Sequence, residues 1–190
     1  MKFKPGKKGG DLAVQLKSRE DRLPIGEGSF PFAIRRILVP VDFSDCSKKA
    51  LQYAVAFARQ FEAKVVLLNV TESFVPMPEM SGIDIGLMDS QLKELAVKQL
   101  TALEESLEDA TKTEIATRTG RPHVEIVTAA KELDIDLIIL STHGRTGLAH
   151  VLMGSTAERV VQRADCPVLI VREREHEFTK PRVPLHSPPR

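Results

Sequence analysis

The chain of 190 residues is long enough for one domain with extensions, and 42% apolar residues allow a sizeable core. A net charge of +1 gives no reason to expect nucleic acid or an acidic partner. The two cysteines, Cys46 and Cys166, form no C-x-x-C pair, which argues against a disulfide framework or a cysteine metal cluster. No apolar run approaches the ~20 residues that span a bilayer, and the basic N-terminus lacks a secretory pattern, so we expect a cytoplasmic protein.

Both ends of the chain differ in composition from its middle. In residues 1–32, lysines interrupted by Pro5 and glycines are typical of a flexible extension. The alternation of Leu12, Val14 and Leu16 leaves open a short strand within it. Residues 174–190 combine charges with four prolines, which predicts a loosely ordered tail. We therefore expect a single domain over residues 33–173.

The domain opens with a buried strand followed by an amphipathic helix. Residues 35–44 read as the strand and its polar turn, and residues 47–60 as an alanine-rich helix. Because ligands of open α/β sheets lie beyond the carboxyl ends of the strands, Asp42 is a candidate for ribose or metal contact. An Asx-turn that caps the next helix explains Asp42 equally well. Residues 64–70 form a second buried strand.

The middle of the domain contains a long connection. Residues 71–88 are unusually apolar for a loop and suit a cover over a ligand or a subunit contact. A helix over residues 89–107 and an alternating strand over 112–118 follow, the strand being expected at the sheet edge. Pro122 suits the first position of the next helix, which runs over residues 123–133.

The most informative stretch runs from Asp136 to Glu158. Four apolar residues, 137–140, predict a strand buried on both faces, and a polar, glycine-containing loop follows it. Ser155 or Thr156 suits the N-cap of the next helix, over 155–164, with Glu158 at the capping-box spacing from Ser155. Free N–H groups at that helix start favour an anion such as phosphate, although a plain tight loop has the same pattern.

Specific residues of this stretch resemble a known family. Ser141-x-x-Gly144, nine further residues and Gly154-Ser155 resemble the nucleotide motif G-x2-G-x9-G-[S/T] of the universal stress protein family. The resemblance continues into residues 166–171 and covers about residues 33–173. The first motif glycine is here Ser141, which keeps a free N–H but adds a Cβ that crowds the ligand or strains the backbone if φ is positive.

The alternation of strands and helices predicts an α/β fold with a parallel sheet and right-handed crossovers. The resemblance implies a Rossmann-like open five-stranded parallel sheet, order 3-2-1-4-5, with helices on both faces and a site between the first and fourth strands. It further implies ATP, or else AMP or ADP, with Mg²⁺ accompanying the nucleotide and Val70 lying against the adenine. The expected contact residues are Pro40, Val41, Asp42, Val70, Leu140, Ser141, His143, Gly144, Arg145, Gly154, Ser155 and Thr156.

The family resemblance leaves three functions open. We expect an ATP-binding stress-response or signalling module; a slow ATP-hydrolysing or phosphoryl-transfer enzyme and a nucleotide-free dimeric scaffold are the alternatives. His143 could act as a base only with Asp42 as partner, so ligand contact is favoured over catalysis. The last strand, over residues 167–172, leaves an apolar edge that suits a homodimer. One tyrosine and no tryptophan provide no RNA-binding aromatic platform.

Overall fold

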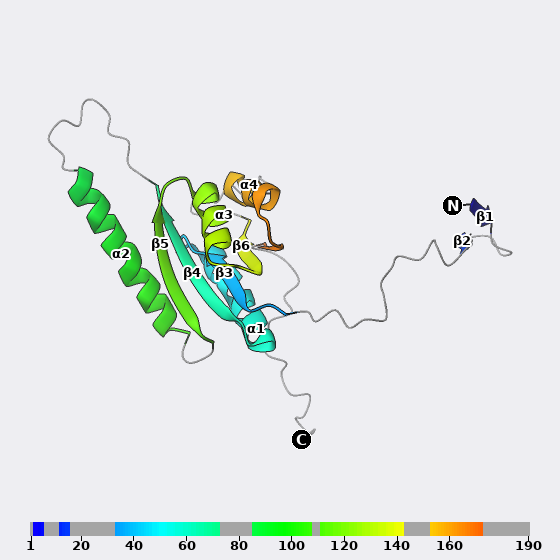
Figure 1. The fold of residues 1–190 in the computed structure, drawn as a ribbon, viewed down its shortest axis with the longest axis horizontal. Coiled ribbons are helices and arrows are strands. Elements are labelled where there is room, and N and C mark those ends of the chain that lie inside the picture. The colour runs from blue at the N-terminus through cyan, green and yellow to red at the C-terminus, as the bar shows by residue number, and fades with distance from the viewer. Residues whose placement is uncertain are drawn as a thin grey trace, which may run out of the picture. The chain divides into compact units, whose positions relative to one another are not determined.

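A computed structural model of the chain describes residues 2–5, 12–15, 33–72, 85–107, 111–142 and 153–172 (Figure 1). Residues 1–32 and 33–190 form separate units. In the first unit, strand β1 (Lys2–Pro5) pairs antiparallel with β2 (Leu12–Gln15). β2 is the short strand that the alternation of Leu12 and Val14 left open, whereas a strand over Lys2–Pro5 was not predicted.

The second unit contains a five-stranded parallel sheet in the order β5-β4-β3-β6-β7. The sheet comprises β3 (Arg36–Pro40), β4 (Lys64–Thr71), β5 (Thr113–Thr119), β6 (Leu137–Ser141) and β7 (Val168–Val171). Counted along the chain within this sheet, the order is 3-2-1-4-5, so the predicted fold is confirmed. β5 and β7 form the two edges, as expected.

Two helices cover each face of the sheet (Figure 1). α1 (Asp45–Phe61) and α2 (Ile85–Glu105) contribute to the core on one face, and α3 (Pro122–Glu132) and α4 (Ser155–Arg163) to the core on the other. β4 alternates between the two cores, since Val65 and Leu67 pack on the first and Val66 and Leu68 on the second. Burial on both faces explains why its sequence is a continuous apolar run.

Several element ends differ from the predicted ones for identifiable reasons. α1 begins at Asp45 because Ser44 is its N-cap and accepts a hydrogen bond from Ser47 N at 3.2 Å. α2 begins at Ile85 rather than residue 89, which shortens the predicted connection; residues 73–84 lie outside the described part of the chain. Pro122 occupies the start of α3 as expected.

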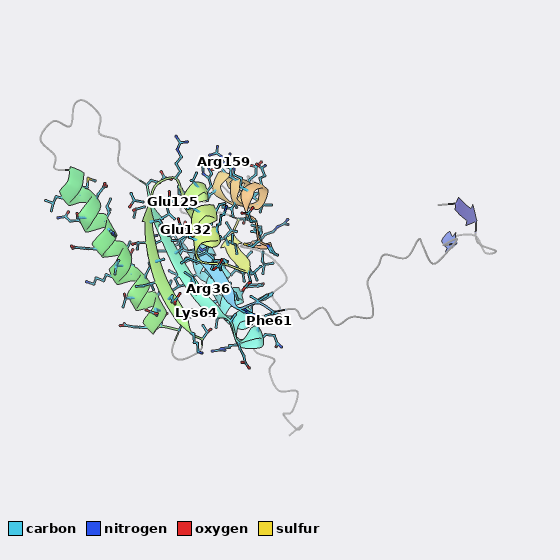
Figure 2. The ribbon with its side chains drawn as sticks, viewed as in Figure 1. Arg36, Phe61, Lys64, Glu125, Glu132 and Arg159 are labelled. Atoms are coloured by element: carbon cyan, nitrogen blue, oxygen red, sulfur yellow. The ribbon has the colours of Figure 1, made fainter. Side chains whose placement is uncertain are left out.

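The amino ends of the strands are tied together by charged side chains. The Glu114 carboxylate on β5 accepts hydrogen bonds from Arg36 at 2.9 Å and from Lys64 at 2.6 Å, and Figure 2 labels both cations. The Lys64 hydrogen bond, with the charges of Lys64 and Arg36, lowers the pKa of Glu114. One oxygen of Asp136 accepts from Arg35 N at 2.7 Å and Arg36 N at 2.9 Å. These contacts hold the end of the sheet opposite to the cavity described below.

Candidate functional site

A cavity opens at the carboxyl ends of the strands, where β3 and β6 separate. The β3–β6 pairing covers Ile37↔Leu137 and Leu38↔Ile138, whereas the β3–β4 pairing continues to Pro40↔Leu68. The two strands therefore diverge at the point where the chain direction across the sheet reverses, which is where ligands bind in open α/β sheets. The cavity has a volume of about 640 Å³, within the range of ligand sites.

The cavity collects the predicted site residues that the structure describes. These residues all line it: Pro40, Val41, Asp42, Val70, Leu140, Ser141, Gly154, Ser155 and Thr156. His143, Gly144 and Arg145 lie outside the described residues. The segments that carry the lining residues are far apart in the sequence, and the sheet topology brings them together. That they contact a nucleotide stays a prediction.

Two backbone hydrogen bonds fix the ends of the glycine-containing loop. Thr142 N donates to Val171 O at 3.0 Å, and Gly154 N donates to Thr142 O at 2.8 Å. The start of α4 is thereby held beside the end of β6. Ser141 lies in the extended β6 strand, and the structure does not give it a positive φ, so its replacement of a motif glycine causes no backbone strain.

The N-cap of α4 was predicted wrongly. Gly154 is the N-cap, with φ −67° and ψ 151°, and its carbonyl accepts a hydrogen bond from Glu158 N at 3.0 Å. Ser155 is already helical, so it forms no capping box with Glu158. Because glycine has no side chain, the N-cap residue makes no side-chain hydrogen bond to this helix. Among the described residues, the first N–H groups of α4 thus remain available beside the cavity, where the helix dipole favours an anion.

Asp42 holds the turn between β3 and α1. Its Oδ1 accepts hydrogen bonds from Ser44 N at 3.1 Å and from Ser44 Oγ at 2.6 Å. The Asx-turn alternative therefore describes the local structure correctly. Oδ2 has no hydrogen-bond partner among the described residues, which leaves one carboxylate oxygen for a ligand in the cavity that Asp42 lines. Phe43, which lies between Asp42 and Ser44, has a φ of 67°, an uncommon value for a residue with a large side chain.

Helix α2 contributes a wall of the cavity that the sequence did not indicate. Leu92, Leu95, Ala96 and Gln99 line it. Leu92 and Leu95 remain 38% and 52% exposed, so they are not part of the closed core. Their spacing is that of an ordinary amphipathic helix, and nothing in the sequence distinguishes a leucine beside a cavity from one in the core. Asn69 and Thr142, two buried polar residues in the lining, were also missed.

One buried histidine of α3 lies close to three arginines. His123 on α3 is buried, and its desolvation, together with the charges of Arg159, Arg163 and Arg121, lowers its pKa. Figure 2 shows Arg159 on α4.

The described residues contain no group of three or more His, Cys, Asp or Glu side chains able to hold a metal ion. None of the helices in the described ranges is long and apolar enough to cross a membrane.

Comparison with known proteins gives the family. A model of the universal stress protein family matches residues 33–172. Universal stress protein MJ0531 of Methanocaldococcus jannaschii is 35% identical over 146 residues, which are 75% of this chain and 85% of that protein. The solved structure of MJ0577 from the same organism matches with a TM-score of 0.66 and 31% identity, covering 75% of this chain and 99% of that one. A universal stress protein solved in complex with cAMP matches with a TM-score of 0.52 and 26% identity, covering 73% of this chain and 97% of that one. The chain belongs to the universal stress protein family.

Proposed function

We propose that the protein binds an adenine nucleotide, with ATP as the favoured ligand, and acts as a stress-response or signalling module. The observation that carries this proposal is the cavity at the divergence of β3 and β6, which combines an uncapped helix start with an available carboxylate oxygen. The cAMP complex of a related protein supports an adenine nucleotide.

The lining residues supply a partner for each part of the ligand. The N–H groups of Ser155 and Thr156 at the start of α4 bind phosphate oxygens. The Oδ2 of Asp42 accepts a ribose hydroxyl, and Val70 packs against the base. His143, Gly144 and Arg145 complete the phosphate site in this proposal. Mg²⁺ accompanies the triphosphate, since this ion commonly keeps its waters and binds substrate phosphates with few protein ligands.

A slow ATP-hydrolysing or phosphoryl-transfer enzyme is the second candidate. Rapid phosphoryl transfer needs a positioned base and a charge clamp. One oxygen of Asp42 is already engaged by Ser44, and the cavity lining contains no arginine or lysine among the described residues. We therefore expect turnover far below ~1 s⁻¹. ATP turnover of several per second, lost in Asp42→Ala, would support the enzyme instead. The cavity at the carboxyl ends of β3 and β6 argues against the third candidate, a nucleotide-free scaffold, because such a scaffold needs no ligand cavity.

The remaining parts of the proposal follow the sequence. Residues 1–32 form a flexible N-terminal extension, residues 33–173 the universal stress protein domain and residues 174–190 a proline-rich tail. We propose a cytoplasmic homodimer joined through the edge strand β7, without nucleic acid or membrane partners. In β7, Val171 O accepts from Thr142 N in the chain segment after β6. The alternation of a strand then directs the N–H and C=O of Ile170 to the open edge, where a second β7 can pair.

Calorimetric titration of nucleotide-free protein with ATP and Mg²⁺ tests the main proposal. We expect a saturable signal with ATP and a weaker one with adenosine, which lacks the phosphates. Absence of any signal up to millimolar ATP, in protein that is folded and free of copurified nucleotide, would reject it. Tight binding of adenosine with no gain from the phosphates would reject the phosphate site alone.

A further inference from the structure

One buried polar side chain, Asn69, occupies a position that a backbone donor would take in a regular sheet. Asn69 is 7% exposed, lines the cavity, and donates from Nδ2 to Val41 O at 2.8 Å. Val41 N in turn donates to Leu68 O at 2.8 Å. Both backbone groups of Val41 are therefore bonded to β4, although β3 itself ends at Pro40.

The register shows which group the Asn69 amide replaces. In a parallel ladder, a residue that donates to Leu68 O receives its second hydrogen bond from the N–H of the residue two positions further along, here Val70. Lys64 N donates to Arg35 O on the β3 side, and Val65 N donates to Lys112 O on the β5 side. By this alternation the backbone groups of Val70 point toward the β3 side, so the N–H of Val70 would be the regular donor to Val41 O. The side-chain amide of Asn69 donates to Val41 O in its place.

The replacement leaves Val70 available to a ligand. Its N–H and C=O have no hydrogen-bond partner among the described residues, and Val70 lines the cavity. One residue thus offers a donor and an acceptor at the same edge. Adenine presents a complementary pair, an acceptor ring nitrogen beside an amino donor, whereas guanine presents a carbonyl acceptor where adenine has its amino group.

The same contact steadies the ribose side of the cavity. Val41 immediately precedes Asp42, whose carboxylate is fixed by Ser44 on the following side. Between these anchors Phe43 adopts φ 67°, a conformation that persists only when its surroundings determine it. The Asn69 amide is the side-chain anchor on the β4 side of this turn.

We propose that Asn69 is a positioning residue that determines base specificity: it takes over the Val41 carbonyl, frees the Val70 backbone to read adenine, and fixes the Asp42 turn. This inference rests on the proposed nucleotide function. Without the amide donor, Val70 N–H closes the ladder to Val41 O and is lost to the base. The loss affects adenine recognition and leaves the phosphate contacts at α4 in place.

The test compares Asn69→Leu, which removes the donor at similar size, with Thr111→Val. Thr111 Oγ1 also donates to a backbone carbonyl, Ala63 O at 3.1 Å, but at the amino end of the sheet. In Asn69→Leu we expect ATP affinity to fall about tenfold, as for one lost hydrogen bond, and the preference for ATP over GTP to shrink by a similar factor. Affinity for tripolyphosphate should not change, and Thr111→Val should retain both affinity and preference.

Amide hydrogen exchange of the ligand-free proteins gives a second readout. Exchange of the Val41 to Ser44 amides should accelerate in Asn69→Leu and stay unchanged in Thr111→Val. If Asn69→Leu fails to fold, Asn69→Asp keeps the shape without the donor and should give the same selectivity loss. An unchanged ATP to GTP ratio in a folded variant overturns this inference while leaving the proposed function intact. Absence of ATP binding by the native protein rejects both.

Discussion

Gly154 offers the sharpest separation of helix stability from ligand binding. Its φ of −67° and ψ of 151° are open to any residue, so the backbone does not require glycine there. Serine is a preferred N-cap residue, and in Gly154→Ser its hydroxyl would accept a hydrogen bond from the N–H of Thr156 or Ala157. The substitution should therefore preserve or improve α4 while occupying donors that we assign to phosphate.

The expected magnitudes have opposite signs. Replacement of an N-cap glycine by serine should raise the free energy of unfolding by a few tenths of a kcal/mol. Loss of one hydrogen bond to a charged phosphate should cost about 1.5–3 kcal/mol of binding, or roughly 10- to 150-fold in ATP affinity. Gly154→Val, which places a branched side chain where phosphates approach, should abolish ATP binding.

Urea unfolding and calorimetric titration measure the two effects on the same samples. Adenosine serves as the matched ligand, because its affinity should not change in Gly154→Ser. If Gly154→Ser and Gly154→Val both bind ATP as tightly as the native protein, the phosphate site is not at the start of α4. Parallel losses of ATP and adenosine affinity would instead indicate general damage to the cavity.

Three further predictions concern self-association, pH and packing. Ile170→Pro removes an N–H that is directed to the open edge of β7, so light scattering should show a folded monomer in place of a dimer. The control is Leu169→Pro, whose N–H is directed to β6 and which should unfold the chain. A monomeric native protein would refute the proposed contact. Because the pKa of His123 is lowered in the folded state, the unfolded state takes up a proton at a higher pH than the folded state does. The buried neutral His123 therefore contributes its full stability above pH 6.5, and this contribution is lost as the pH falls through the folded-state pKa. His123→Gln should flatten urea-monitored stability over that window, and an unchanged slope would contradict the burial argument. Leu100→Ala, at a fully buried position on α2, should lower the free energy of unfolding by about 2–5 kcal/mol, and a loss under ~1 kcal/mol would show that α2 packs loosely.

The sheet was predictable because its central strands are continuous apolar runs between recognisable helices. Such a run is buried on both faces, which restricts it to a parallel sheet, and the family motif supplied the strand order. The same motif predicted residues that now line one cavity, among them Asp42 and Gly154, and their contact with a nucleotide stays a prediction. Their convergence on one cavity depends on β3 and β6 being neighbours, which the strand order implies.

What the sequence did not reveal depends on contacts between distant residues. Gly154 as N-cap could not be distinguished from Ser155, because a polar side chain suits that position better than glycine does. Asn69 lies inside an apolar run, and its hydrogen bond to Val41, far away in the sequence, appears only in the folded chain. Leu92 and Leu95 are partly exposed in the fold although they share the helical spacing of buried leucines. Periodicity describes a helix face but not what lies opposite to it.

A crystal structure of nucleotide-free protein soaked or grown with ATP and Mg²⁺ tests the central claim most directly. We predict phosphate oxygens within hydrogen-bond distance of the N–H groups of Ser155 and Thr156, a ribose hydroxyl on Asp42 and the base against Val70. A nucleotide bound away from the carboxyl ends of β3 and β6, or an empty cavity at saturating ATP, would contradict the account.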